Sequence, residues 1–532
     1  MSLGFGIKEL RFSWKAVSGA DYYRMLENPD GTSGYTQVGA NLTALSVNHT
    51  IPVHRRLNAS YIVEACNSAG CTGSAAQILG ANLTQAIGYV KASLTGSYNY
   101  FGASVALSGD GNTMAVGVQN CDGTCARDTV YVYARSAGTW SQQATVTALN
   151  PGPDQFGHSL ALSNDGNTLA VGAPNEDSSS TGIGSTPDER APDAGAAYIF
   201  ARSGGKWSQQ AYVKASNTGA GDLFGSAVAL SGDGTTLAVG APNEDSSTTG
   251  VNAVPNELRS NAGAAYVFVL NGATWSQQAF VKAATTFLGV DDLFGRSVAL
   301  SDNGNTLAVG GRVDTCDDGC MDNAVFLYTR SATIWSPQAS VMASNHLDSD
   351  LFGYSVALSG DGNTLAVGAP YEDSSTVGVN TKPDELAIDS GAVYVFTRSG
   401  ATWLEQVYVK ASNTGAGDNF GISVALADDG NTLAVGAAFE DSSTTGIGST
   451  PNEAAGDAGA VYVFTRSAGI WSQKAYVKAS NTGAGDNFGI SVTLSRDGNT
   501  LAVGAPYEDS GTNGIGSTPN ELATNAGAVY LY

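Results

Sequence analysis

Residues 224–241 read FGSAVALSGDGTTLAVGA, and this stretch decides the fold. Two apolar segments, 226–231 and 236–241, flank the tetrapeptide Gly232-Asp233-Gly234-Thr235. Asp-Gly supplies the positive φ angles that a tight hairpin requires, so the stretch predicts two antiparallel strands. A sheet with one wet face would alternate apolar with polar residues, whereas bulky and small apolar residues alternate here. We therefore expect both faces of this hairpin to be covered.

The same pattern recurs along most of the chain. A Phe-Gly pair occurs seven times, and a glycine follows sixteen residues after each phenylalanine. Two aromatic residues and then, six times, a tryptophan-led segment follow, which predicts strands like 263–269 and 275–283. Four-stranded sheets covered on both faces, repeated every ~68 residues, predict an all-β fold, a seven-bladed β-propeller. We expect these phenylalanines and tryptophans to pack in the core: Phe101, Phe156, Phe224, Phe294, Phe352, Phe420, Phe488, Trp140, Trp207, Trp275, Trp335, Trp403 and Trp471.

The count of repeats predicts how the ring closes. Seven Phe-Gly units are followed by only six tryptophan-led strands, and the chain stops at Tyr532 in the third strand of the last unit. Residues 86–93, AIGYVKAS, match the fourth strand of the other units. We expect this segment to complete the seventh sheet, with Tyr89 near Tyr530, which removes an exposed sheet edge.

These motifs closely resemble the FG-GAP repeat family, known from integrin α subunits, over residues 86–532. The resemblance implies a seven-bladed propeller, an extracellular location, and adhesion or binding rather than catalysis. Integrin-type repeats hold calcium in a D-x-D-x-D-G-like loop between the first two strands, and this chain departs from that pattern. Its compact hairpins carry one aspartate each, which we expect to bond the turn's own amides: Asp110, Asp165, Asp233, Asp361, Asp429 and Asp497.

Residues 1–80 lack the repeat, so we expect two domains, 1–80 and 81–532. Residues 10–17 and 19–25 resemble the B and C strands of a fibronectin type III module, and 61–71 resemble its F strand and the turn into G. This resemblance implies a small β-sandwich, with Cys66 and Cys71 facing each other across a hairpin. No clear first strand precedes these segments, so we expect the chain to start partway through its natural sequence.

The composition and the net charge limit which classes of partner the chain can bind. The chain has 48 acidic and 25 basic residues and a net charge of −23, a field that repels nucleic acid. Its apolar stretches are far shorter than the roughly 18 residues that span a bilayer, so we expect no membrane insertion. We expect a monomer whose partner is a protein or a glycan on a cell surface or in a matrix.

The six cysteines fall into three close pairs. Thiolate metal sites need three or four converging ligands, and no pair has a third cysteine or a nearby histidine. Three local disulfides therefore fit better, and they predict an oxidising compartment, with the protein secreted or at the cell surface, extracellular or periplasmic. The pairs are Cys66 with Cys71, Cys121 with Cys125, and Cys316 with Cys320.

Long acidic loops separate the second and third strands of five units. In a propeller, these loops and the connections between units emerge on one face, which we expect to be strongly acidic. The connections carry Asp222, Asp291, Asp292, Asp350, Asp418 and Asp486. Two readings of the loops stay open: their oxygens coordinate Ca²⁺, or their polar side chains bond the loop backbone without metal. The candidate calcium ligands are Asp177, Asp245, Asp373, Asp441 and Asp509.

A search for catalytic groups finds no asymmetric constellation, so we expect no enzyme. His49, His54, His158 and His346 lie in no catalytic or metal-binding motif, and we expect them at the surface. Three function classes remain: an adhesion or protein-interaction module, a carbohydrate-binding module, and, with least support, an enzyme acting on polysaccharide. The long loops carry almost no aromatic residues apart from Tyr371, Phe439 and Tyr507, which favours a protein partner.

Overall fold

Seven four-stranded antiparallel sheets make up most of the described chain in this computed structural model, which describes residues 1–118, 129–150, 152–283, 292–314, 321–345 and 350–532. We number the sheets in chain order. Sheets 1 to 3 consist of β10 (Phe101–Leu107), β11 (Thr113–Val118), β12 (Thr129–Ser136) and β13 (Thr139–Val146); β14 (Ser159–Leu162), β15 (Thr168–Ala173), β16 (Ala196–Ser203) and β17 (Lys206–Val213); and β18 (Ala227–Leu230), β19 (Thr236–Ala241), β20 (Ala264–Asn271) and β21 (Thr274–Val281).

The remaining sheets repeat this order with one exception at the end. Sheets 4 to 6 consist of β22 (Val298–Leu300), β23 (Thr306–Asp314), β24 (Met321–Ser331) and β25 (Ile334–Val341); β26 (Ser355–Leu358), β27 (Thr364–Ala369), β28 (Ala392–Ser399) and β29 (Thr402–Val409); and β30 (Ser423–Leu426), β31 (Thr432–Ala437), β32 (Ala460–Ser467) and β33 (Ile470–Val477). Sheet 7 takes its fourth strand from early in the chain: β34 (Ser491–Leu494), β35 (Leu501–Ala505), β36 (Ala528–Leu531) and β9 (Gly88–Val90).

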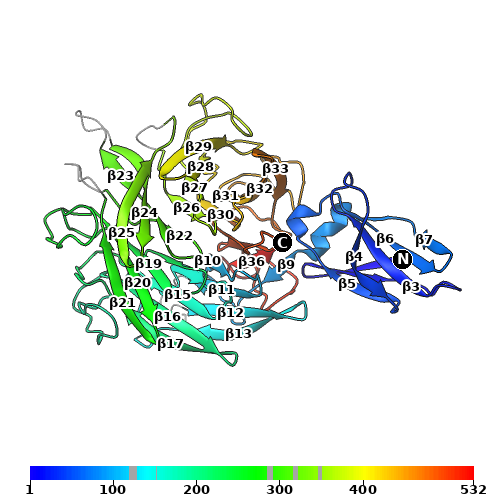
Figure 1. The fold of residues 1–532 in the computed structure, drawn as a ribbon, viewed down its shortest axis with the longest axis horizontal. Helices are drawn as coiled ribbons and strands as arrows, with labels where there is room; N and C mark the ends of the chain where they lie inside the picture. Colours follow the sequence, from blue (N-terminus) through cyan, green and yellow to red (C-terminus); the bar gives the residue numbers. More distant parts are fainter. Residues whose placement is uncertain (119–128, 151, 284–291, 315–320, 346–349) are drawn as a thin grey trace.

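The sheets form a closed ring. Each first strand contacts the first strand of the next sheet, and β34 of sheet 7 contacts β10 of sheet 1. In sheet 7, Tyr530 pairs with Tyr89, and the two rings lie 5.5 Å apart between centroids. Figure 1 shows the red end of the chain beside the blue segment that carries β9. The predicted β-propeller and its closing strand are confirmed.

The hairpin between the first two strands of each sheet has the predicted chemistry. In sheet 3, Oδ1 of Asp233 accepts the main-chain N–H of Thr235 and the hydroxyl of Ser231. Gly234 has a φ of +69°, in the region that favours glycine. The first bond recurs in all seven hairpins, with Asn303 as the acceptor in sheet 4. These side chains satisfy their own turns, as we expected.

The core lies between neighbouring sheets. Phe224 is fully buried and meets Tyr266 and Phe268 edge-on at 5.3 and 6.1 Å, an arrangement that the other Phe-Gly units share. Six of the seven tryptophans of the chain open fourth strands, and all of these except the half-buried Trp207 are buried. A Cβ at Gly240 would lie 1.9 Å from the carbonyl oxygen of Gly295 in the next unit. The repeated glycine therefore allows backbone to pack on backbone.

The amino-terminal residues form two further sheets. One contains β1 (Ser2–Gly6), β2 (Glu9–Ser13) and β5 (Ser46–Thr50). The other contains β4 (Thr36–Leu42), β3 (Tyr22–Asn28), β6 (Ser60–Asn67) and β7 (Gly70–Gly73), with β8 (Gln77–Ile78) paired to β6. Two short 3₁₀ helices complete this part of the chain: η1 (Val53–Arg55) lies between β5 and β6, and η2 (Gly80–Ala86) follows β8. The expectation of no clear first strand was wrong, because β1 pairs with β2 along its whole length.

One of the three predicted disulfides can be examined. Cys66 and Cys71 are bonded across the β6–β7 hairpin, with an S–S distance of 2.07 Å. Cys121, Cys125, Cys316 and Cys320 lie outside the described residues. No helix among the described residues is long and apolar enough to cross a bilayer.

The amino-terminal sheets pack against the ring beside sheets 6 and 7 (Figure 1). Nζ of the buried Lys8 donates to the carbonyl oxygen of Tyr532 at 2.7 Å and to Oγ1 of Thr500 at 3.0 Å. His54 is also buried here, with Nε2 3.1 Å from the carbonyl oxygen of Gly498. The expected surface position of His54 was therefore wrong, because the ring covers it where the amino-terminal sheets pack against sheet 7.

Candidate functional site

One face of the ring collects carboxylates from two kinds of connection. Asp222 lies in the connection from sheet 2 to sheet 3, and its carbonyl oxygen accepts the N–H of Asn243 in the long loop of sheet 3. Burial, helped by the nearby carboxylates of Glu244, Glu257 and Asp245 and opposed by a bond from the Gly219 N–H, raises the pKa of Asp222 to about 7. Asp418 and Asp486 repeat this arrangement, each with a pKa of about 7. The long loops and the connections meet on one face, as predicted, but Asp222, Asp350, Asp418 and Asp486 are buried there, so the exposed carboxylates of this face come from the long loops.

The candidate calcium ligands bond the loops that carry them. Oδ1 of Asp177 accepts the main-chain N–H of Asp193 at 2.8 Å, which closes the long loop of sheet 2. Equivalent bonds, each from the main-chain N–H sixteen residues later in the chain, are accepted by Asp245, Asp373, Asp441 and Asp509. Where the chain is described, Glu64 with Cys66 and Cys71 is the sole cluster of three His, Cys, Asp or Glu ligand atoms within 4.8 Å, and both thiols are in the disulfide.

Each long loop is anchored by a buried ion pair that the sequence analysis missed. In sheet 5, Nζ of Lys410 lies 2.8 Å from Oε2 of Glu372, and neither side chain is exposed. Tyr408 donates its hydroxyl to the other carboxylate oxygen at 2.7 Å. The equivalent pairs are Lys91 with Glu508, Lys214 with Glu176, Lys282 with Glu244, and Lys478 with Glu440. These glutamates hold the base of the loop and are not available as surface ligands.

The buried glutamates also join neighbouring sheets. Asn345, which follows the last strand of sheet 4, donates to Oε1 of Glu372 in sheet 5 at 3.0 Å. Tyr394 donates its hydroxyl to Oδ1 of Asn345 at 2.6 Å. Asn150, Asn217, Asn413 and Asn481 make the same two bonds at four other junctions. A polar network thus links successive sheets at the loop face.

The middle of each long loop folds back along the outer strand of its own sheet. In sheet 2, Ile183 forms a β-bridge with Val213, and Gly184 donates its N–H to the carbonyl oxygen of Tyr212. Equivalent bridges occur at Val251, Val379, Ile447 and Ile515. The loop therefore covers an edge that would otherwise present unpaired backbone groups.

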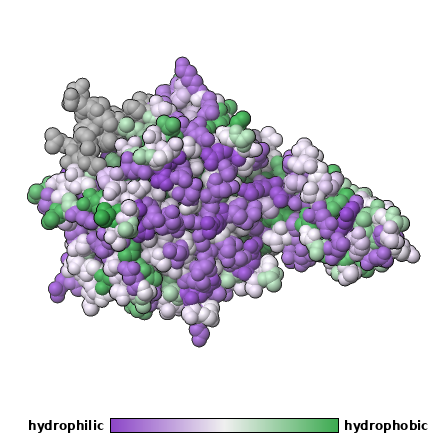
Figure 2. All heavy atoms as spheres, viewed as in Figure 1, coloured by the Kyte–Doolittle hydropathy of each residue, from purple (hydrophilic) through white to green (hydrophobic). Residues whose placement is uncertain are grey.

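Three of the long loops expose a leucine beside a glutamate. Leu258, Leu386 and Leu522 each follow a Pro-x-Glu sequence, and their side chains are 76%, 77% and 80% exposed. By contrast, Tyr371 and Tyr507 are 40% exposed, and Phe439 is half-buried. The visible surface in Figure 2 is mostly hydrophilic, with hydrophobic residues in scattered groups. The loop face thus combines carboxylates with isolated aliphatic side chains.

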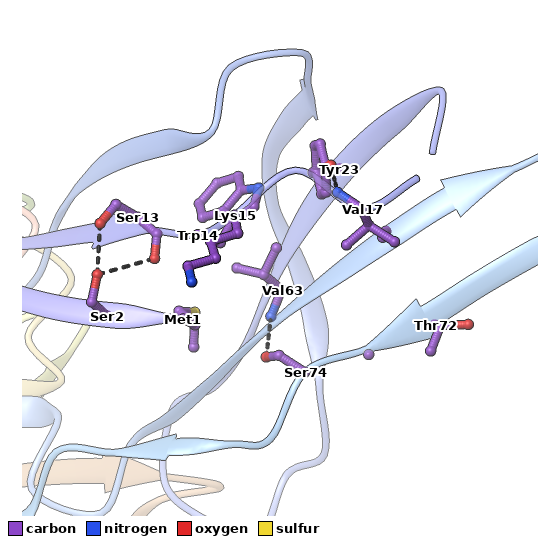
Figure 3. A pocket seen from close by; sticks show the side chains of 12 residues that line it. Met1, Ser2, Ser13, Trp14, Lys15, Val17, Tyr23, Val63, Thr72 and Ser74 are labelled. Atoms are coloured by element: carbon purple, nitrogen blue, oxygen red, sulfur yellow. Dashed lines mark hydrogen bonds between the residues drawn. The ribbon is translucent and has the colours of Figure 1, made fainter. Parts of the chain in front are cut away.

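A separate cavity of about 640 Å³ opens in the amino-terminal domain. Figure 3 shows Met1, Trp14 and Val63 grouped on its wall, between the strand pair β1–β2 and strand β6. The hydroxyl of Tyr23, on the same wall, accepts the N–H of Val17 at 2.8 Å. His158 is half-buried, and burial lowers its pKa, whereas His346 lies outside the described residues, as does Asp291.

Comparisons with known proteins identify a family. The family model described as FG-GAP repeat matches residues 140–200, 207–268, 335–396, 403–464 and 471–532, which together are more than half of the chain. Each match runs from the tryptophan of one fourth strand to the third strand of the next sheet. Among curated proteins, none matches the chain.

Several solved structures are similar at low sequence identity. The WD40 repeats of RRP9 align with a TM-score of 0.45 and 11% identity, over 84% of this chain and 96% of that one. The periplasmic gluconolactonase PpgL of Pseudomonas aeruginosa aligns with a TM-score of 0.41 and 13% identity, over 87% and 98%. Sqt1 from Chaetomium thermophilum aligns with a TM-score of 0.41 and 13% identity, over 79% and 82%.

Proposed function

This chain belongs to the FG-GAP repeat family, and from that membership we propose that it is a non-enzymatic, extracellular adhesion or protein-interaction module. In this proposal the seven sheets are the blades of a seven-bladed propeller, and residues 1–80 form a fibronectin type III-like domain. The protein acts as a secreted or cell-surface monomer, and its acidic loop face contacts the partner.

The observation that carries the proposal is the set of exposed leucines on the acidic loops. Isolated surface leucines are common, but these three recur at one loop position beside a glutamate. Interfaces gain affinity from a few desolvated apolar side chains, while surrounding charges steer the encounter and select the partner. A partner with basic groups around apolar pockets fits this pattern. Carbohydrate binding has less support, since no tyrosine of these loops is more than 40% exposed.

Replacing the three leucines tests the proposed face. We expect Leu258→Ser, Leu386→Ser and Leu522→Ser together to weaken binding to the captured surface protein by at least about tenfold, since residues that matter in an interface each cost more than about 1 kcal/mol. The partner is captured in a surface-protein pull-down, run beside a glycan array, and its affinity is then measured by surface plasmon resonance.

The matched control lies at the other end of the sheets. Ile334 and Ile470 are 69% and 73% exposed and begin fourth strands, next to the hairpins opposite the loop face. The variant Ile334→Ser with Ile470→Ser should bind as tightly as the natural chain. Equal binding by the leucine variant, or a signal from the glycan array alone, would remove this face as a protein contact.

We also propose that calcium braces the loop face. Burial, followed by the nearby carboxylates of Glu440, Glu453 and Asp441, raises the pKa of Asp418. Carboxylate oxygens suit a hard divalent cation, which would have to draw these groups together, since no three of their ligand atoms lie within 4.8 Å of one another. One oxygen of Asp441 also accepts an N–H of its loop. When bound, calcium would neutralise this charge. The aspartates of the five long loops remain candidate calcium ligands in this proposal, together with the aspartates of the connections between sheets.

The pH dependence of stability tests the calcium proposal. Asp222, Asp418 and Asp486 have folded pKa values of about 7, above their ordinary value, so they favour the folded state when protonated. Without calcium, the melting temperature should fall as the pH rises from about 4 to 8. Calcium should restore the melting temperature near pH 8. It should change the melting temperature little near pH 5, where these carboxyls are protonated. The triple Asp→Asn variant should lose both responses in differential scanning calorimetry. Identical melting with calcium and with a chelator at pH 8 would rule out the bound ion.

A further inference from the structure

Glutamines on the outer rim accept hydrogen bonds from the next sheet. Oε1 of Gln406 in sheet 5 accepts two hydrogen bonds, one from the indole N–H of Trp471 at 3.1 Å and one from Nη1 of Arg466 at 2.9 Å. Arg466 also binds Oδ1 of Asn431 at 2.8 Å and contacts Oγ1 of Thr364 in the preceding sheet. Gln143, Gln278 and Gln338 act in the same way at three other junctions. Gln210 accepts the indole N–H alone, because sheet 3 has Leu270 at the arginine position.

At the junction between sheets 6 and 7, neither the tryptophan nor the arginine of the repeat is present. Strand β9 carries no tryptophan, and the arginine comes from the amino-terminal domain. Nη1 of Arg55 binds Oδ1 of Asn499 at 3.0 Å, and Nη2 contacts Oγ1 of Thr432 in the preceding sheet. Asn499 and Thr432 are the repeat equivalents of the two Arg466 partners, Asn431 and Thr364. Arg55 therefore takes the place of the rim arginine.

The rim glutamine is also replaced here, by a cation. Lys474 occupies the position in β33 that Gln406 holds in β29. A glutamine accepts hydrogen bonds, whereas a lysine can only donate them, so Arg55 lacks the rim acceptor that four repeat arginines have. Nε of Arg55 is buried and makes no hydrogen bond within the described structure. A buried donor without an acceptor calls for a ligand or a water.

Arg55 and Lys474 line one groove between the two domains. It has a volume of about 590 Å³, within the range of small-molecule sites. Four side chains with full positive charge line it, against the single carboxylate of Asp30, in a chain whose net charge is −23. Its neutral lining includes Asn58, Asn431, Thr32, Thr432 and Thr465, and contains no phenylalanine, tyrosine or tryptophan; the one aromatic ring, the imidazole of His54, is buried.

We propose that this groove binds a carboxylated saccharide of one or two sugar rings, with the carboxylate between Arg55 and Lys474. A guanidinium presents paired donors that match a carboxylate, and the amide and hydroxyl groups suit sugar hydroxyls. The groove has no exposed aromatic ring, since its lining histidine is buried, and this disfavours a nucleotide, whose base would need a stacking partner. This groove is separate from the acidic loop face, so neither proposal depends on the other.

The test is calorimetric titration of the full chain with digalacturonate, at low and at physiological ionic strength. Lys474→Gln restores the residue that five other junctions carry, so the sheet should tolerate it. Losing one charged donor should weaken digalacturonate binding about tenfold. Lys206→Gln is the matched control, because Lys206 is an exposed lysine at the start of β17 in sheet 2.

The expected result is binding of digalacturonate by the natural chain and by Lys206→Gln, with the tenfold loss in Lys474→Gln and no binding of the neutral disaccharide galactobiose. The proposal is overturned if digalacturonate does not bind, or if Lys474→Gln binds it as tightly as the natural chain. It is also overturned if galactobiose or inorganic phosphate binds equally well, since the groove would then not select a carboxylated sugar.

Discussion

Lys410→Met is expected to destabilise the protein by about 3–5 kcal/mol, because it leaves the Glu372 carboxylate buried without its cation. Burial by itself would raise the pKa of Glu372, but Lys410 and the Tyr408 hydroxyl hold it below its ordinary value. Neither side chain of the pair reaches solvent, so water cannot replace the lost partner. The free energy of unfolding from urea titration at neutral pH measures the loss.

The double variant Lys410→Met with Glu372→Gln separates charge from packing. A neutral amide can still accept the hydroxyl of Tyr408, so we expect the double variant to recover most of the lost stability. Sheets 1 and 4 show that the position tolerates a neutral residue, because they carry Thr147 and Met342 there. If the single variant were as stable as the natural chain, the ion pair would contribute nothing to the loop anchor.

The ion pairs could have been read from the sequence. A lysine ends the fourth strand in the five sheets that have a long Glu-Asp loop, and it is absent in sheets 1 and 4, where the loop is short. Seven copies of one motif in a single chain thus show which residues vary together. In the sequence the loop acids form one Glu-Asp group, and nothing local separates the buried glutamate from the aspartate that follows it.

Strand positions were more predictable than contacts between domains. The expected segments 226–231 and 236–241 correspond to β18 and β19, since apolar alternation and an Asp-Gly turn are local signals. The burial of His54 and Lys8 has no local signal, because it depends on which surface of the ring the amino-terminal domain covers. The hydrogen bonds of Asp177 likewise depend on where the loop returns, sixteen residues later.

The second large effect concerns the strand that closes the ring. A chain lacking residues 1–92 is expected to aggregate rather than fold, because it loses β9 together with Lys91, the partner of the buried Glu508. An uncompensated buried carboxylate costs about 3–5 kcal/mol, and exposing the apolar contacts of Tyr89 and Val90 costs about 1.5–3 kcal/mol each. Together these losses approach the 5–15 kcal/mol that typically stabilises a folded domain. The free edge of β36 would then be open to pairing with another chain.

A chain lacking only residues 1–79 is the comparison that assigns this effect to the strand. It keeps η2 and β9 but loses Lys8 and Arg55, whose bonds to Tyr532 and Asn499 join the domains. We expect this shorter chain to stay monomeric and to melt at a lower temperature than the full protein, because the ring is still closed. Size-exclusion chromatography and calorimetry of the three chains decide the matter. If the chain beginning at residue 93 melted as a monomer within a few degrees of the one beginning at residue 80, the closing strand would not hold the ring, and the seventh sheet would be stable with three strands.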